Sequence, residues 1–199
     1  MDYSRKKKIL ILLVVFLFHF LLPHTAAAED ALTESESLKK EENAVDLESA
    51  LKKLNILIKM GFETADVYFN RGWIYAELGN YDLAKKDYSH ALELDNSYTD
   101  AYFNRGLIYM KEKKYAKAIS DFSRIIELNP ESSDAYCNRG NAYLQIGKSR
   151  KALKDYNSAI ELDNEDPDLY FNRGLVYQAR GKINDAEADF EKAKELRIK

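Results

Sequence analysis

Apolar and aromatic side chains return along this chain at a fixed interval of 34 residues. The motif YFNRG occurs at 68–72, 102–106 and 170–174, and YCNRG takes its place at 136–140. Within each interval the apolar positions form two groups with spacings of three and four residues, which places each group on one face of an α-helix. The pattern therefore predicts an all-α chain in which helices come in pairs.

Four consecutive units follow from this interval: 65–98, 99–132, 133–166 and 167–199. When the first residue of each unit is position 1, one helical face carries positions 4, 8 and 11, and a second carries positions 20, 24 and 27. Position 8 is always Gly and position 24 is always aromatic. We expect Gly to let the two helices of a unit approach closely, with the aromatic ring filling the space between them.

A short turn is predicted between the two helices of each unit. Three of these turns carry a glycine (Gly79, Gly147, Gly181) where a helix end favours a left-handed residue. The remaining turn has Lys113, which we expect to adopt the same conformation at a cost of about 1 kcal/mol. Pro occupies position 32 only at Pro130, so the second helix of the other units has no such stop.

This arrangement resembles the tetratricopeptide repeat family, whose period and whose pattern of small and aromatic positions match residues 65–199. The resemblance implies an α-solenoid of four tandem helix-turn-helix repeats, in which each hairpin buries its apolar face against its neighbours. Residues 43–60 match the second helix of a degenerate repeat, and we expect them to form an N-terminal capping helix. Charged residues on the outer face of the last helix, Glu187 and Lys194, predict the end of the stack.

The N-terminus has the three parts of a secretory signal peptide. Basic residues at 5–8 precede an apolar run at 9–22, and the small residues Ala26 and Ala28 follow. We expect residues 1–28 to be removed and the protein to be periplasmic or secreted, with a polar segment at 29–42 ahead of the repeats. The alternative is a membrane anchor at 9–22, although that run is shorter than the ~20 residues that span a bilayer.

Composition and charge argue against several classes of function. The chain has a net charge of −3, and residues 1–28 carry four basic residues and one acidic residue, so residues 29–199 carry −6. Mixed charges on an acidic protein argue against nucleic-acid binding. No His/Cys cluster or phosphate-binding loop is present, and Cys137 has no neighbouring His to activate it. We therefore expect no catalysis, cofactor, metal or small-molecule substrate, and a chain that is monomeric in isolation.

Position 6 is Asn in every unit, although Asn is a poor helix former that adds little to a core. One Asn side chain can bond both the C=O and the N–H of a peptide unit, so a row can hold an extended chain by its main chain. The row is similar to the asparagine ladder in the tetratricopeptide superhelix of O-linked N-acetylglucosamine transferase. The resemblance implies a peptide-binding concave face that comprises Asn70, Asn104, Asn138, Asn172, Phe69, Phe103, Phe171, Trp73, Leu107, Asn141, Asp66, Asp100, Asp134 and Asp168. The alternative is that these Asn residues bond the neighbouring repeat.

Each unit also combines Arg at position 7 with Asp at position 23. An Arg near a helix–helix contact needs a partner, so we predict ion pairs within a unit or between neighbours. The residues are Arg71 and Asp87, Arg105 and Asp121, Arg139 and Asp155, and Arg173 and Asp189. The alternative is a row of Arg that binds an acidic ligand.

These observations predict a non-catalytic module that binds a protein or peptide. We expect it to serve as an adaptor, assembly factor or chaperone in the cell envelope. The alternative is a constitutive structural subunit of a larger membrane-associated complex. Clamping of a C-terminal carboxylate is disfavoured, because position 2 is Asp and position 5 is Phe or Cys, where that mode needs Lys.

Overall fold

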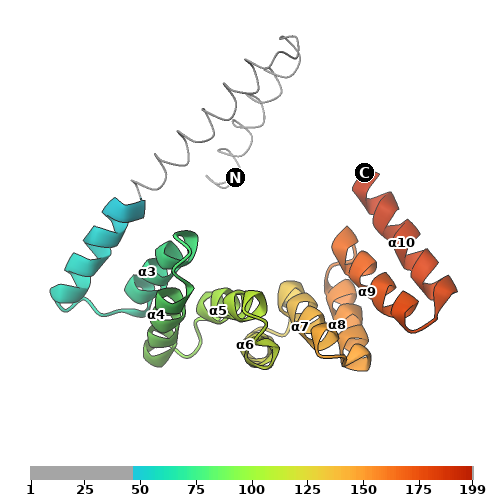
Figure 1. Ribbon diagram of the computed structural model, residues 1–199, viewed down its shortest axis with the longest axis horizontal. Coiled ribbons are helices and arrows are strands. Elements are labelled where there is room, and N and C mark those ends of the chain that lie inside the picture. Colours follow the sequence, from blue (N-terminus) through green and yellow to red (C-terminus); the bar gives the residue numbers. More distant parts are fainter. Residues whose placement is uncertain (1–46, 199) are drawn as a thin grey trace, which may run out of the picture. The chain divides into compact units, whose positions relative to one another are not determined.

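The computed structural model describes residues 47–198. Backbone contacts divide the chain after Ala50, and the four described residues of the first unit, 47–50, are helical. In the second unit, residues 51–59 are helical and eight further helices follow in chain order (Figure 1). Their bounds are α3 Ala65–Glu77, α4 Tyr81–Leu94, α5 Thr99–Lys111, α6 Tyr115–Leu128, α7 Ser133–Gln145, α8 Ser149–Leu162, α9 Pro167–Ala179 and α10 Ile183–Ile198. The described residues contain no strand, so the all-α prediction is confirmed.

The predicted signal peptide, the polar segment at 29–42 and the membrane-anchor alternative at 9–22 all lie outside the described residues. Of the predicted capping helix, residues 47–59 are helical and 43–46 lie outside them. Among the described helices, none combines the length and the apolar character needed to cross a membrane.

The turn inside each repeat is built from the same two backbone hydrogen bonds. In the first repeat, Asn80 N–H bonds the Tyr75 carbonyl at 2.7 Å and Gly79 N–H bonds the Ala76 carbonyl at 3.0 Å. This arrangement needs a left-handed residue, and Gly79 has φ +77°. Lys113 adopts the same conformation with φ +59°, as its place in the repeat predicts.

The loops between repeats end the second helices at the same position whether or not Pro is present. Helices α4, α6 and α8 stop at Leu94, Leu128 and Leu162, all at position 30. The absence of Pro at position 32 therefore does not lengthen α4 or α8. Two of the following helices begin with a side-chain cap, because Ser132 Oγ accepts from Ala135 N–H and Asp166 Oδ1 accepts from Asp168 N–H.

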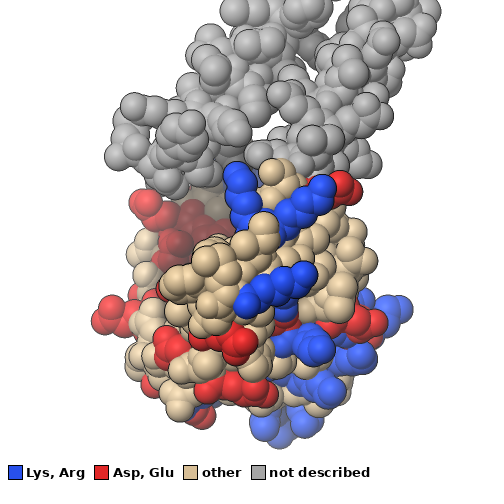
Figure 2. Space-filling model, turned by 90° about the vertical axis from the view of Figure 1, so that its left-hand side faces the viewer, with Lys and Arg blue, Asp and Glu red and all other residues tan. Residues whose placement is uncertain are grey.

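The loops between repeats are acidic, whereas the turns of the second and third repeats are basic. The segments 92–101, 126–135 and 160–169, which join one repeat to the next, each hold at least three carboxylates and no Lys or Arg. By contrast, the turns of the second and third repeats, 110–118 and 144–152, hold Lys and Arg in excess. On the face drawn in Figure 2, blue side chains gather mainly on one side and red side chains mainly on the other.

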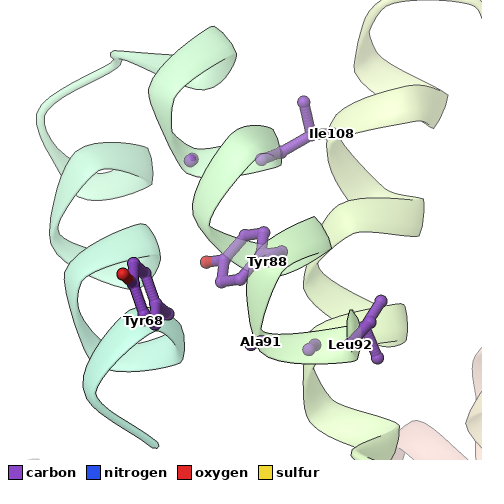
Figure 3. Close-up of a cluster of buried hydrophobic side chains, with 7 residues drawn as sticks. Tyr68, Tyr88, Ala91, Leu92 and Ile108 are labelled. Atoms are coloured by element: carbon purple, nitrogen blue, oxygen red, sulfur yellow. The ribbon is translucent and has the colours of Figure 1, made fainter. Parts of the chain in front are cut away.

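The core lies between the two helices of each repeat and continues into the next repeat. Tyr88 and Ala91 on α4 are fully buried, and they pack with Tyr68 of α3 and Ile108 of α5 (Figure 3). The residues equivalent to Tyr88 in the later repeats are Phe122, Tyr156 and Phe190, and those equivalent to Ala91 are Ile125, Ala159 and Ala193. All of them are buried except Phe190, which is half-buried. Helices α4, α6 and α8 each pack on both their own first helix and the first helix of the next repeat, and α10 packs on α9. The fold is therefore a stack of helical hairpins.

Position 8 is glycine because the aromatic ring of position 24 occupies the space that a side chain would need. A Cβ atom added at Gly106 would lie 2.9 Å from Phe122 Cε1, and one at Gly140 would lie 3.1 Å from Tyr156 Cε1. Real Cβ atoms are almost never as close as the first of these distances. The predicted close approach of the two helices is thus present in the structure.

Candidate peptide-binding face

The side chains predicted to bind a peptide all lie on the first helices of the repeats, α3, α5, α7 and α9. We call positions 2, 5, 6 and 9 of these helices the ladder face. At position 6, the Nδ2 atoms of Asn70, Asn104 and Asn138 donate to the carbonyl oxygen four residues earlier, at 2.8, 2.9 and 2.9 Å. These three donors therefore bond their own helix. The side chain of Asn172 instead lies close enough to the Cys137 thiol of the preceding repeat to act on its pKa, which is the kind of contact that the alternative interpretation predicts.

One N–H of each of these three side-chain amides is therefore used in a hydrogen bond to the helix backbone. The carbonyl oxygen and the second N–H of each side chain make no hydrogen bond in the described part of the chain. An amide in this state retains one donor and one acceptor, the pair that a peptide unit complements. The bond to the helix backbone also holds the side chain in one orientation.

Apolar side chains at positions 5 and 9 lie beside these amides. Trp73, Leu107 and Phe171 are exposed to 44%, 40% and 38%. Phe69 and Phe103 are half-buried, and the ring of Phe103 packs edge-on against the ring of Phe122. The ladder face therefore combines polar groups with partly exposed apolar surface.

Asn141 at position 9 makes a core contact that its place in the repeat does not predict. Its Oδ1 atom accepts a hydrogen bond of 2.6 Å from the hydroxyl of Tyr156, which is fully buried. The equivalent hydroxyl of Tyr88 is also buried, but position 9 of its repeat is Trp73, and no partner for the hydroxyl is present in the described residues. Burial raises the pKa of both tyrosines. Asn141 thus satisfies a core hydroxyl that the first repeat leaves unpaired.

This contrast predicts opposite effects of one substitution at two equivalent positions. We expect Tyr156→Phe to lower the free energy of unfolding by about 1 kcal/mol, because it breaks a buried hydrogen bond. We expect Tyr88→Phe to raise it by about 1 kcal/mol, because it removes an unpaired buried hydroxyl. Urea unfolding of the two variants measures both changes, and a shift in the same direction for both would contradict the assignment of Asn141.

The Arg of position 7 and the Asp of position 23 form a bidentate ion pair within each repeat. In the second repeat, Arg105 Nε and Nη2 donate to the two carboxylate oxygens of Asp121 at 2.9 and 2.7 Å. The other repeats place Arg71 with Asp87, Arg139 with Asp155 and Arg173 with Asp189 in the same way. Every Asp of the set is at most 5% exposed.

A further bond links each of these Arg side chains to the preceding repeat. Arg105 Nη1 donates to Ser89 Oγ at 2.9 Å. The equivalent acceptors are Asn55 for Arg71, Ser123 for Arg139 and Asn157 for Arg173. The guanidinium groups are therefore used within the stack, which disfavours the alternative of an Arg row that binds an acidic ligand. The sequence carries a signal for this bond, because position 25 is Asn or Ser in every unit that precedes one of these Arg residues, and Glu191 takes its place only in the last unit.

The Asp residues of position 2 are not equivalent. Asp66 accepts a hydrogen bond from the Tyr98 hydroxyl at 2.9 Å, and Asp168 accepts one from Arg197 Nη2 at 2.7 Å. Asp100 and Asp134 instead line a hollow of about 300 Å³ between the second and third repeats. Sequence reasoning missed Tyr98 and Arg197, because they lie outside the repeated apolar positions.

The described residues contain no group of three or more His, Cys, Asp and Glu side chains arranged to hold a metal ion. Burial, together with the nearby Asp166, raises the pKa of the Cys137 thiol to about 11. This thiol is therefore protonated at neutral pH, and a protonated thiol is a poor nucleophile.

Comparisons with known proteins agree on the architecture. A family model described as tetratricopeptide repeat matches residues 65–98, 99–132 and 167–197. A second model of that description matches 122–154, and one described as TPR repeat matches 140–181. The sequences of curated proteins gave no match.

Several solved structures share the fold at low sequence identity. A crystal structure of MamA aligns with a TM-score of 0.74 and 24% identity, covering 80% of this chain and 93% of that one. MamA from Desulfovibrio magneticus RS-1 aligns with a TM-score of 0.73 and 22% identity, covering 84% and 94%. YrrB, described as a TPR protein with an unusual peptide-binding site, aligns with a TM-score of 0.70 and 23% identity, covering 81% and 82%. The family matches and the stacked hairpins lead to one conclusion: the chain belongs to the tetratricopeptide repeat family.

Proposed function

We propose that this protein is an interaction module that holds an extended segment of a partner protein on the ladder face. The observation that carries the proposal is the state of the Asn side chains at position 6. In three repeats one N–H is bonded to the helix backbone, and one N–H and the carbonyl oxygen are available to a ligand. A segment bound in this way is held mainly through its main chain.

The partly exposed apolar side chains support the same proposal. Trp73 and Leu107 lie at position 9 of the first two repeats, and both expose about two-fifths of their surface. Apolar side chains of a bound segment would cover this surface and add affinity to the main-chain bonds. YrrB, which shares this fold, is described as having a peptide-binding site, and this supports peptide binding as the kind of function.

We further propose that the module acts in the cell envelope, as an adaptor, assembly factor or chaperone. This part of the proposal rests on the signal-peptide pattern of residues 1–28. A constitutive structural subunit would differ in behaviour, because it would fractionate as a permanent complex with membranes. Fractionation of the cells that make the protein distinguishes the two roles.

Substitution of the ladder amides tests the binding mode. Peptides selected against the protein from a random library provide the probe, and their affinity is measured by isothermal titration. We expect Asn104→Ala/Asn138→Ala to weaken binding at least tenfold, because two pairs of main-chain hydrogen bonds are lost. The helix itself should remain intact, since Ala is a better helix former than Asn.

The matched control replaces two exposed Asn residues that lie off the ladder face. Asn80→Ala/Asn184→Ala removes the same chemical groups and should leave the affinity unchanged. Equal affinity of the native protein and the ladder variant for every selected peptide would show that the position 6 amides serve only the fold.

A further inference from the structure

Two repeats show what the Asp of position 2 and the Phe of position 5 do together. In the fourth repeat, Arg197 Nη2 donates to Asp168 Oδ1 at 2.7 Å. The same guanidinium group lies over the ring of Phe171, 5.4 Å from its centre. An acid and an aromatic ring on neighbouring turns of α9 thus bind one cationic side chain of the chain itself.

The first repeat uses the same pair in a similar way. The Tyr98 hydroxyl donates to Asp66 Oδ1 at 2.9 Å, and the centre of the Tyr98 ring lies 4.9 Å from that of Phe69. In both repeats the side chain that covers the pair comes from the end of the repeat, at position 34 for Tyr98 and position 31 for Arg197. The Asp–Phe pair is therefore a site for a planar side chain with a hydrogen-bond donor.

The second repeat has this pair without a covering side chain. Its Asp100 and Phe103 correspond to Asp168 and Phe171, but its positions 31 and 34 are the short residues Asn129 and Ser132. Asp100, Phe103 and Asn129, which correspond to Asp168, Phe171 and Arg197, all line the hollow of about 300 Å³. The hollow is lined by Thr99, Asp100, Phe103, Ile125, Asn129, Ser132 and Asp134.

The hollow is acidic as well as open. The carboxylates of Asp100 and Asp134 make no ion pair or hydrogen bond with any described residue, and no Lys or Arg lines the hollow. The hollow also adjoins the ladder face, because Asn104 Nδ2 donates to the carbonyl oxygen of Asp100. A segment held at Asn104 would thus pass over two uncompensated negative charges.

We propose that this hollow binds an arginine side chain of the partner segment. The guanidinium group would bond Asp100 and Asp134 and lie over Phe103, in the way that Arg197 bonds Asp168 and lies over Phe171. Arginine fits better than lysine, because its planar group can bond a carboxylate at two points and stack on a ring at the same time. Tyrosine, the occupant in the first repeat, would leave both charges uncompensated. The identity of the ligand as a partner segment rests on the proposed function.

Two five-residue peptides test the proposal: acetyl-Ala-Ala-Arg-Ala-Ala-amide and the same peptide with citrulline in place of arginine. Citrulline keeps the shape of the side chain and removes its charge. In titrations followed by the backbone amide signals of the protein in NMR spectra, we expect the arginine peptide to bind about tenfold more tightly. The largest shifts should fall at Phe103 and Ser132.

Substitutions that remove carboxylate charges then test which residues cause the difference in affinity between the two peptides. We expect Asp100→Asn/Asp134→Asn to remove the difference between the two peptides, and both residues are exposed, so the fold should persist. The matched control, Glu131→Gln/Glu165→Gln, changes the net charge equally on exposed residues outside the hollow and should keep the difference. A difference that survives the first pair of substitutions, or no binding of either peptide, overturns the proposal.

The same titrations separate this proposal from the proposed function. If both peptides bind equally and Asn104→Ala/Asn138→Ala weakens both, the arginine site is wrong and capture of the main chain stands. If the arginine peptide binds selectively and the Asn variant is no weaker, the arginine site stands and capture of the main chain is wrong.

Discussion

Asp121→Ala is expected to lower the free energy of unfolding by about 3 to 5 kcal/mol, the largest effect of any single substitution considered for this protein. Asp121 is 4% exposed and accepts two hydrogen bonds from Arg105, whose side chain is 17% exposed. Removing the carboxylate leaves a guanidinium group without its counterion in a mostly buried place. Urea unfolding followed by circular dichroism measures the loss.

Two further variants show that the loss comes from the stranded charge. Arg105→Met/Asp121→Leu removes both charges and replaces them with apolar side chains, so it should be more stable than Asp121→Ala alone. Glu131→Ala deletes an exposed carboxylate from a loop and should change stability by no more than about 0.5 kcal/mol. A double variant that is less stable than Asp121→Ala would contradict this account of the pair.

Gly106→Ala is expected to lower the free energy of unfolding by about 2 kcal/mol. Alanine by itself would favour the helix by about 1 kcal/mol, so the steric cost has to exceed that gain. The added Cβ would lie 2.9 Å from Cε1 of Phe122, and this ring is fully buried between the second and third repeats, so it has no space into which to move. Thermal and urea unfolding of the variant measure the net effect.

Gly174→Ala is the matched control for this steric argument. Its Cβ would lie 2.7 Å from Cε1 of Phe190, which is closer than in the second repeat. Phe190 is only half-buried, because no repeat follows it in the described chain, so its ring can turn away. We therefore expect a loss below about 1 kcal/mol. Equal losses for the two variants, or a gain for Gly106→Ala, would show that burial of the ring does not decide the cost.

The repeat interval was sufficient to predict the helices and the core. Spacings of three and four residues identify the buried faces in any helix, and a period that returns four times leaves one consistent register. Even the unusual conformation of Lys113 follows from its place in the series, since the turn geometry is dictated by the neighbouring repeats. The helices, their buried faces and the turn conformation depend on the spacing of residues along the chain, and this spacing can be read from the sequence.

Contacts that depend on a single repeat were not predictable in the same way. The roles of Tyr98 and Arg197 arise from where two loop or end residues reach in space, and no period marks them. Asn141 lies at a position of the predicted peptide-binding face, and it also bonds the buried hydroxyl of Tyr156, a contact that Trp73 cannot make with the equivalent hydroxyl of Tyr88 in the first repeat. Side-chain reach, and not helix position, decides these cases.

The bond from each guanidinium group to the preceding repeat gives the stack a direction. Every Arg of position 7 depends on an acceptor that lies earlier in the chain, such as Ser89 for Arg105. Shortening the protein from its carboxyl end would leave the remaining guanidinium groups with all their acceptors. Shortening it from the amino end would deprive the new leading hairpin of one acceptor, as loss of Asn55 would for Arg71. With respect to this hydrogen bond, the two ends of the stack therefore differ: loss of the last hairpin costs no acceptor, and loss of the segment before the first hairpin costs one.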